Sequence, residues 1–289
     1  MSEQSQDRLV DLMERLDSKP IVVASHPRSG THLMIDCLRL NFPECRCWKL
    51  WGEKSDALYV DMDRLVSHSQ RLTVKEAERA IRRTRRPIFK THALADFQHV
   101  FVGRHDPFSP RLIDWLKRNA SFIYMHRDGR ESLSSGFVHW GARKACSTLG
   151  DYMRHPDENE NSRAAAWAHH VRTWLATPGV CRVSMEQLLA DPRTVLGDLA
   201  SRLGLKAGRG ELRTPRIRRK TPISRLLRAL SLHAESTAVL LTERPHDWRE
   251  TLTPADRKAF HHDAGEVLIQ LGYEQSDAWV GRAVNSRAA

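Results

Sequence analysis

Long apolar runs are missing from this 289-residue sequence. The strongest of them, such as Ile21–Ala24, span only a few residues, whereas a membrane-spanning helix requires about 20 consecutive apolar residues. We therefore expect no transmembrane segment. The first twenty residues also lack the apolar core of a secretory signal, and we expect a short amphipathic helix there instead.

Cysteine is scarce as well. The five cysteines are odd in number and show no paired spacing, which argues against a disulfide framework. Cys45 and Cys47 are too close together and too isolated for a structural zinc site, which needs four ligands. We expect reduced thiols, no metal site and a cytoplasmic protein.

Aromatic residues make up only 7% of the chain, and acidic residues are outnumbered by basic ones. Lys and Arg total 46 against 35 Asp and Glu, which gives a formal net charge of +11. Such a charge suits nucleic acid or another polyanion. However, the aromatic residues do not interleave with the basic ones, and no helix-turn-helix or zinc-finger spacing is present. Non-catalytic polyanion binding is thus the less favoured alternative.

Short apolar segments alternate with helical patterns along the chain. This alternation favours a parallel sheet. We predict one α/β domain over residues 1–289, with a central parallel sheet flanked by helices and residues 1–18 as an N-terminal helix or extension. The expected strands are Ile21–Ala24, Pro87–Thr91, Ser121–Met125 and Val180–Ser184.

Capping residues mark several expected helix ends. Asp128 and Glu131 have the spacing of a capping box, and Asp191 precedes a proline suited to a first helical turn. Gly204 stands where a C-terminal glycine would. Thr253, also followed by proline, is expected to open the last helix.

The loop after the first strand has the composition of an anion-binding site. Residues 27–33 read Pro-Arg-Ser-Gly-Thr-His-Leu. Gly30 permits a tight turn, Arg28 supplies charge, and the start of the next helix directs unpaired N–H groups to the same point. The loop lacks the Gly-x-x-x-x-Gly-Lys pattern, which disfavours a nucleotide-dependent phosphotransferase. An ordinary strand-to-helix turn is the alternative for this heptapeptide alone.

Two further strands end in basic residues. Lys90 and His92 close the second strand, and Arg127 follows the third, with Ser135 in the next helix. Because ligands bind beyond the carboxyl ends of strands in open α/β sheets, we expect these groups to face one crevice. A histidine suits proton abstraction and a lysine suits developing negative charge. A structural histidine, and an arginine paired with acidic neighbours, are the alternatives.

In this order the three loops resemble those of the sulfotransferases that use 3′-phosphoadenosine 5′-phosphosulfate (PAPS) as donor. Residues 27–33 are similar to the family's 5′-phosphosulfate loop, and Arg127 with Ser135 match its 3′-phosphate pair. Residues 90–92 resemble its Lys-Thr-His segment, in which the histidine is the general base. The resemblance extends over about residues 20–273.

Two later segments carry the same resemblance, namely residues 183–192 and 246–249. It implies transfer of a sulfuryl group from PAPS to a hydroxyl, less readily an amine, with release of 3′-phosphoadenosine 5′-phosphate (PAP) and no metal. The implied catalytic residues are His92, Lys90 and Arg28. The implied nucleotide-binding residues are Arg28, Ser29, Gly30, Thr31, His32, Leu33, Arg127, Ser135, Met185, Trp248 and Arg244.

Some positions depart from the family pattern. Arg28 replaces the common lysine, which keeps the charge and adds a bidentate fork. Residues 32–33 are His-Leu instead of Thr-Trp, so an adenine-stacking tryptophan is missing, and Met185 replaces a tyrosine. In place of an Arg-Lys-Gly triplet the chain offers Arg244 and the run 218–220.

Residues 209–228 are strongly basic. We interpret the surrounding segment 206–246 as a lid over the nucleotide or a surface facing the acceptor, with a merely solvated basic face as the alternative. A glycan, a glycolipid and a secondary metabolite are the acceptor classes considered. The run carries one acidic residue, Glu211, and eight basic ones, Arg209, Arg213, Arg216, Arg218, Arg219, Lys220, Arg225 and Arg228.

Overall fold

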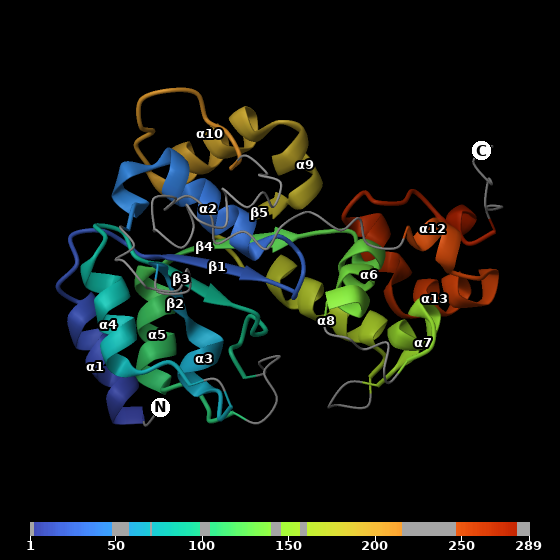
Figure 1. Ribbon diagram of the computed structural model, residues 1–289, viewed down its shortest axis with the longest axis horizontal. Helices are drawn as coiled ribbons and strands as arrows, with labels where there is room; N and C mark the ends of the chain where they lie inside the picture. Colours follow the sequence, from blue (N-terminus) through green and yellow to red (C-terminus); the bar gives the residue numbers. More distant parts are fainter. Residues whose placement is uncertain are drawn as a thin grey trace, which may run out of the picture.

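A parallel sheet forms the centre of the molecule. The computed structural model describes residues 3–47, 58–69, 71–98, 105–139, 146–156, 161–215 and 247–281. Within these residues lies a five-stranded sheet of order β2-β3-β1-β4-β5, and all its pairings are parallel (Figure 1). The strands are β1 (Ile21–Ser25), β2 (Val60–Asp61), β3 (Ile88–Thr91), β4 (Ser121–His126) and β5 (Cys181–Ser184). The predicted α/β class is confirmed.

Strand β2 is absent from the sequence-based expectation. It contains two residues only, Val60 and Asp61, which pair with Phe89 and Lys90 of β3. A two-residue strand is too short to show an apolar run or an alternation. Its position at the sheet edge nevertheless brings an acidic segment beside β3.

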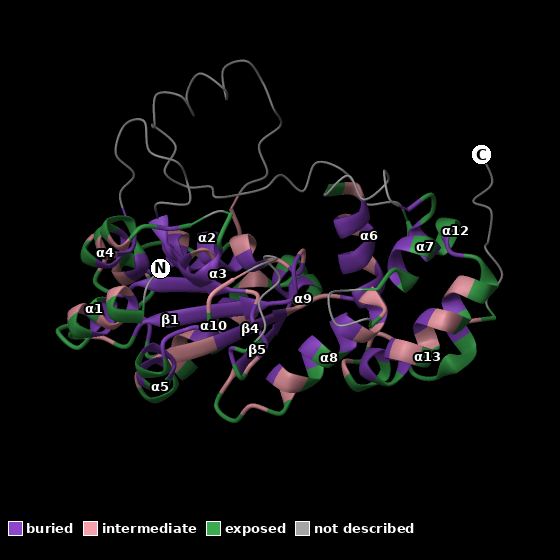
Figure 2. Cartoon of the chain, turned by 90° about the horizontal axis from the view of Figure 1, so that it is seen from below, coloured by how far each residue is buried: buried purple, intermediate pink, exposed green. Residues whose placement is uncertain are grey.

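The sheet is buried on both faces, as helical crossovers on both sides require. In β1, Val22 and Ala24 join one apolar cluster, while Ile21 and Val23 join the other. All four residues are fully buried (Figure 2). The continuous apolar run in the sequence therefore reflects burial on two sides rather than an amphipathic strand.

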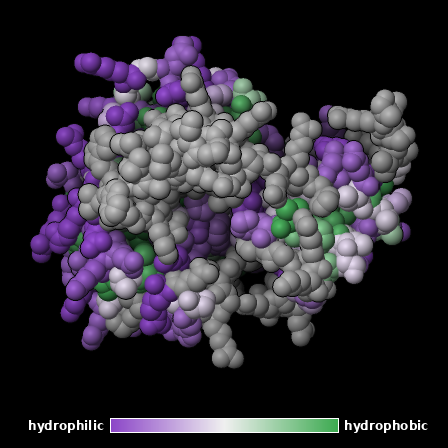
Figure 3. All heavy atoms as spheres, viewed as in Figure 1, coloured by the Kyte–Doolittle hydropathy of each residue, from purple (hydrophilic) through white to green (hydrophobic). Residues whose placement is uncertain are grey.

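Two sets of helices supply these layers. Helices α2 (Thr31–Asn41), α9 (Met185–Ala190) and α10 (Pro192–Leu203) cover the face of Ile21. The opposite face packs against α1 (Glu3–Met13), α3 (Met62–Val66), α4 (Val74–Arg82), α5 (Pro110–Asn119) and α8 (Arg163–Leu175). The expected N-terminal helix thus corresponds to α1, which contacts α4 and α5. Over α1 and α4 the described surface is mainly hydrophilic (Figure 3).

A group of helices lies beside the carboxyl ends of the strands (Figure 1). They are α6 (Gly129–His139), α7 (Leu149–Arg154), α12 (Trp248–Thr251) and α13 (Pro254–Gln270). Helix α12 contacts α6 and α7, and α13 contacts α7 and α8. Short 3₁₀ turns at Pro43–Cys45 and Asp277–Trp279 complete the described elements.

Most predicted caps are confirmed. Gly204 ends α10 in the left-handed conformation with φ of 62°, Asp191 caps that helix, and Thr253 caps α13. The capping box predicted between Asp128 and Glu131 does not form. Asp128 Oδ1 accepts from the backbone N–H of Arg130 at 2.9 Å, while Glu131 pairs with arginines instead.

All five cysteines are buried and carry free thiols. In the described part of the chain, no helix is long and apolar enough to span a bilayer. The same residues hold no group of three or more His, Cys, Asp or Glu side chains suited to a metal ion.

Candidate active site

The loop between β1 and α2 is compact and rests on α6. Arg28 and Gly30 have positive φ angles of 68° and 95°, which turn the chain sharply between strand and helix. Ser132 Oγ of α6 donates to the carbonyl of Pro27 at 2.9 Å and lies 3.2 Å from Ser29 Oγ. Gly30 is the N-cap of α2 and has no side chain to cap it. The first N–H groups of this eleven-residue helix therefore face the loop as anion donors.

Met185 packs against this loop. A Cβ atom on Gly30 would lie 3.2 Å from Met185 Sδ and 3.2 Å from Met125 Cε. Met185 begins α9 directly after β5, and it is buried. Met185, which the family resemblance implies as a nucleotide-binding residue, thus lies against the anion loop and leaves little room for a side chain at position 30.

The other loop residues have different neighbours. Thr31 Oγ1 lies 2.5 Å from Ser25 Oγ, so this buried hydroxyl links the start of α2 to the end of β1. His32 Nε2 lies 3.1 Å from Tyr59 Oη. Leu33 packs against the apolar cluster under α2. Neither His32 nor Leu33 therefore takes the place of the family's tryptophan as a ring on which adenine stacks.

Lys90 lies in a buried acidic pocket. Its Nζ is 2.9 Å from Asp61 Oδ2 and 3.7 Å from Asp63 Oδ2. Burial raises the pKa of Asp63, and the Lys90 ammonium opposes this rise. Sequence analysis missed both carboxylates. The signal available was two acidic residues within an apolar segment, which need a buried cation as partner.

His92 is held on several sides. Its Nδ1 is 2.7 Å from the carbonyl oxygen of Ser25, its backbone N–H donates to Asp63 Oδ2 at 2.9 Å, and its carbonyl lies 3.1 Å from His170 Nε2. Because a carbonyl only accepts, Nδ1 carries the proton and Nε2 is left as an acceptor. Burial, assisted by the charge of Lys90, holds the pKa of His92 well below its usual range. The imidazole is therefore neutral at neutral pH, as a general base must be.

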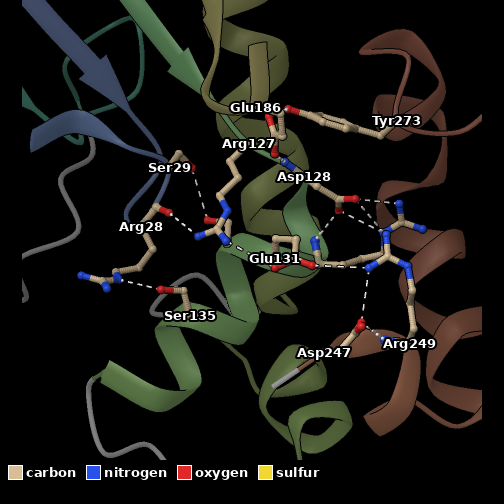
Figure 4. A network of polar contacts seen from close by, with 12 residues as sticks. Arg28, Ser29, Arg127, Asp128, Glu131, Ser135, Glu186, Asp247, Arg249 and Tyr273 are labelled. Atoms are coloured by element: carbon tan, nitrogen blue, oxygen red, sulfur yellow. Dashed lines mark hydrogen bonds and ion pairs between the residues drawn. The ribbon is translucent and has the colours of Figure 1, made fainter. Parts of the chain in front are cut away.

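Three of the predicted phosphate-binding residues lie close together beside the loop between β1 and α2. Arg28 Nε donates to Ser135 Oγ at 3.1 Å, and Arg127 Nη1 donates to the carbonyl of Arg28 at 3.4 Å (Figure 4). Burial, and then the nearby Arg127 charge, lower the pKa of Arg28. Arg28, Arg127 and Ser135 therefore form one continuous polar group, to which the loop after β1 and the segment from the end of β4 into α6 both contribute.

Glu131 and Arg249 extend this group and were not predicted as site residues. Glu131 Oε2 lies 3.3 Å from Arg127 Nη2, and Glu131 Oε1 lies 3.7 Å from Arg249 Nη1 (Figure 4). Arg249 belongs to α12 and also pairs with Asp247 at 3.3 Å. The Asp-Trp-Arg segment was the available signal, since its basic residue follows the tryptophan directly.

Trp248 is buried rather than facing the loop. The guanidinium carbon of Arg130 lies 4.0 Å from the centre of the Trp248 ring, and Trp279 packs edge-on at 5.6 Å. The guanidinium carbon of Arg249 lies 4.6 Å from the same ring. The structure thus brings Arg249, and not the tryptophan ring, to the polar group of Arg127. Arg244 and residues 216–228 of the basic run lie outside the described residues.

Arg130 and Glu186 attach the C-terminal segment to the strand ends. Arg130 pairs with Asp128 and with Glu274, both at 2.7 Å. Glu186 accepts from the hydroxyl of Tyr273 at 3.0 Å and from the backbone N–H of Asp128 at 3.2 Å (Figure 4). These contacts hold the C-terminal helices against the start of α6, where Arg127 lies.

Together these features define an α/β protein whose strand ends carry cations, an open helix N-terminus and a neutral histidine. Residues 20–208 match the model of the sulfotransferase family. The chain belongs to this family, and it is a sulfotransferase-family enzyme.

Two sulfotransferases are among the solved structures that are similar to this chain. The mouse sulfotransferase SULT7A1, solved in complex with PAP, is 15% identical with a TM-score of 0.50, covering 99% of this chain and 96% of that chain. The sulfotransferase domain of the Synechococcus PCC 7002 olefin synthase is 15% identical with a TM-score of 0.47, covering 89% and 96%. No curated protein sequence matches the chain.

Proposed function

We propose that the protein transfers a sulfuryl group from PAPS to a hydroxyl group of an acceptor and releases PAP. The observation that carries this proposal is the contact between Arg28, Ser135 and Arg127 beside the open N-terminus of α2. The loop fits the phosphosulfate end of the nucleotide and the Arg127 side fits a 3′-phosphate. The PAP held by the structurally similar mouse enzyme supports the choice of nucleotide.

His92 is the general base in this proposal. Its Nε2 accepts the proton of the acceptor hydroxyl, because Nδ1–H is committed to the carbonyl of Ser25. The acceptor oxygen forms a bond to sulfur as the bond between sulfur and the bridging oxygen breaks, and PAP keeps that electron pair. The proton passes from His92 to solvent after product release.

Arg28 is the cation that stabilises charge on the transferring group and the leaving phosphate. The N–H groups at the start of α2 bind the same phosphate. The sequence suggested a similar role for Lys90. Because its ammonium lies between Asp61 and Asp63, we assign it instead to keeping His92 neutral and in place.

The acceptor is proposed to be a hydroxylated molecule, with a glycan, a glycolipid and a secondary metabolite as classes to be tried. Incubation with labelled PAPS and a panel of hydroxylated extracts identifies it, since the label moves to the acceptor. Absence of transfer to every extract, together with binding of ATP and Mg²⁺ but not PAP in calorimetry, would favour a phosphotransferase. Salt-dependent binding of nucleic acid without PAP binding would favour the polyanion binder.

The 3′-phosphate assignment has its own test. Ser135→Ala and Arg127→Ala should weaken PAP binding far more than binding of adenosine 5′-phosphosulfate, which lacks the 3′-phosphate. A charge-assisted hydrogen bond contributes roughly 1.5–3 kcal/mol, so a loss of about tenfold or more is expected for Arg127→Ala. Ser201→Ala is the matched control, because this exposed hydroxyl bonds only within α10. Equal weakening of both ligands would refute the assignment.

A further inference from the structure

Glu131 occupies an unusual position, between two arginines that come from different parts of the chain. Arg127 follows β4, whereas Arg249 lies in α12. One carboxylate oxygen faces each guanidinium (Figure 4). A single carboxylate therefore bridges the proposed 3′-phosphate ligand Arg127 and a second cation for which the sequence suggested no role.

Both pairings are loose. The separations of 3.3 Å and 3.7 Å exceed the roughly 2.7–2.9 Å of a good charge-assisted hydrogen bond. The Glu131 side chain is 24% exposed and that of Arg249 is 60% exposed, so solvent and ligands reach the pair. Burial raises the pKa of Glu131, and the charges of Arg127 and Arg249 oppose this rise.

A phosphate monoester suits this place better than the carboxylate. At neutral pH it carries a charge of about −1.5 to −2 and three acceptor oxygens, enough for two guanidinium groups at once. The Arg249 side chain is already held beside Glu131. Asp247 pairs with the Arg249 guanidinium at 3.3 Å, and the Trp248 ring lies beneath that guanidinium. Trp248 thereby acts as a platform for Arg249.

We infer that Arg249 is a second guanidinium ligand of the nucleotide 3′-phosphate, and that Glu131 is an internal anion which this phosphate displaces from between Arg127 and Arg249. The inference rests on the proposed function, because it takes the nucleotide to be PAP or PAPS. It adds a ligand from α12 to the loops after β1 and β4.

Calorimetry with PAP and with adenosine 5′-phosphate tests the inference, because the second ligand lacks only the 3′-phosphate. Arg249→Ala should weaken PAP binding about tenfold and leave adenosine 5′-phosphate unchanged. Arg249→Lys, which keeps the charge without the planar fork, should lose less. Glu131→Gln should tighten PAP binding about threefold, since the competing charge is gone.

Arg172→Ala serves as the matched control. This arginine has a similar exposed ion pair, with Glu266 at 3.4 Å, on α8 and α13. The Arg172→Ala variant should bind PAP and adenosine 5′-phosphate as tightly as the unmodified protein does. Circular dichroism of each variant checks that it folds, and if Arg249→Ala does not, Glu131→Gln decides alone: tighter PAP binding supports the inference and unchanged binding overturns it.

Two failures are distinguishable. If the unmodified protein binds no PAP, the proposed function is wrong and the inference is overturned with it. If the unmodified protein binds PAP and Arg249→Ala binds PAP equally well, only the inference is overturned. Equal weakening of PAP and adenosine 5′-phosphate by Arg249→Ala also overturns it, because the arginine then acts elsewhere than on the 3′-phosphate.

Discussion

Two clusters of charged residues lie at the strand ends, and they differ in how deeply their charged side chains are buried. The inner cluster, Asp61, Asp63, Lys90 and His92, is closed: the Lys90 side chain is 9% exposed and that of Asp63 is 1% exposed. The outer cluster consists of Arg28, Arg127, Glu131 and Arg249. Its members are partly exposed: the side chains of Arg127, Glu131 and Arg249 are 15%, 24% and 60% exposed.

The difference separates two uses of charge in one site. Removing one partner of a buried ion pair lowers the free energy of unfolding by several kcal/mol. The inner cluster therefore fixes the positions of its side chains and does not exchange partners. Loose, exposed pairs contribute little to stability, and a ligand anion can replace one partner at small cost. We assign the inner cluster to placing His92 and the outer cluster to binding the nucleotide.

The His92→Ala variant should distinguish the functions of the two clusters most clearly, because it should affect turnover and not PAP binding. A general base contributes about 10²- to 10⁴-fold to turnover, so transfer from labelled PAPS should fall by at least about 100-fold. PAP binding should persist, because the outer cluster is intact. His262→Ala is the control, as this side chain lies on α13 and is 87% exposed. Undiminished turnover of His92→Ala would remove His92 from catalysis.

Replacement of Asp63 tests whether the buried contacts of the inner cluster stabilise the fold. Its carboxylate accepts from Thr91 Oγ1 at 2.7 Å and from the His92 N–H, and it lies near Lys90. Asp63→Ala leaves these donors buried without an acceptor, and we expect a loss of about 3 kcal/mol in the free energy of unfolding. Urea denaturation measures this loss.

Asp63→Asn and Asp198→Ala complete that experiment. The asparagine keeps an acceptor oxygen and should lose less stability than the alanine. Asp198 is exposed on α10 and should show no change when replaced. If Asp63→Ala is as stable as Asp198→Ala, the inner cluster does not hold the geometry, and the contrast with the outer cluster disappears.

Acid should destabilise the protein through its buried histidines. Burial lowers the pKa of His26 and of His126 from 6.5 to about 4, and it lowers the pKa of His92 and His170 well below that ordinary value. Below pH 6.5 the unfolded chain binds protons that the folded chain does not. The free energy of unfolding should therefore fall by about 1.4 kcal/mol per pH unit for each such histidine.

Urea denaturation between pH 7 and pH 5 measures this effect, which is spread over four histidines. His126→Asn should flatten the dependence, whereas replacement of the exposed His262 should not. Turnover should hold its value below pH 6.5 for as long as the protein stays folded, because His92 remains neutral there. A free energy of unfolding that does not change across this range would contradict the assignment of buried, neutral histidines.

The sequence predicted four of the strands and the loops that follow three of them. Apolar runs ending in Ser-His-Pro, Lys-Thr-His or His-Arg are local signals, and the parallel sheet brings their ends to one edge. Met185 was named only through the family resemblance, as a nucleotide-binding residue, and its position against the anion loop comes from the structure. It failed for Asp128 and Glu131, because the capping spacing is local while the arginines that attract Glu131 lie in other segments.

What the sequence determined by itself is therefore the order of strands and helices, the family and the identity of the residues at the strand ends, since each is written in short, contiguous patterns. Only the tertiary structure decided which charges face one another. Lys90 meets Asp61 and Asp63 because β2 pairs with β3, and Glu131 meets Arg249 because α12 packs on α6. Electrostatic pairing depends on distance in space, which sequence separation does not encode.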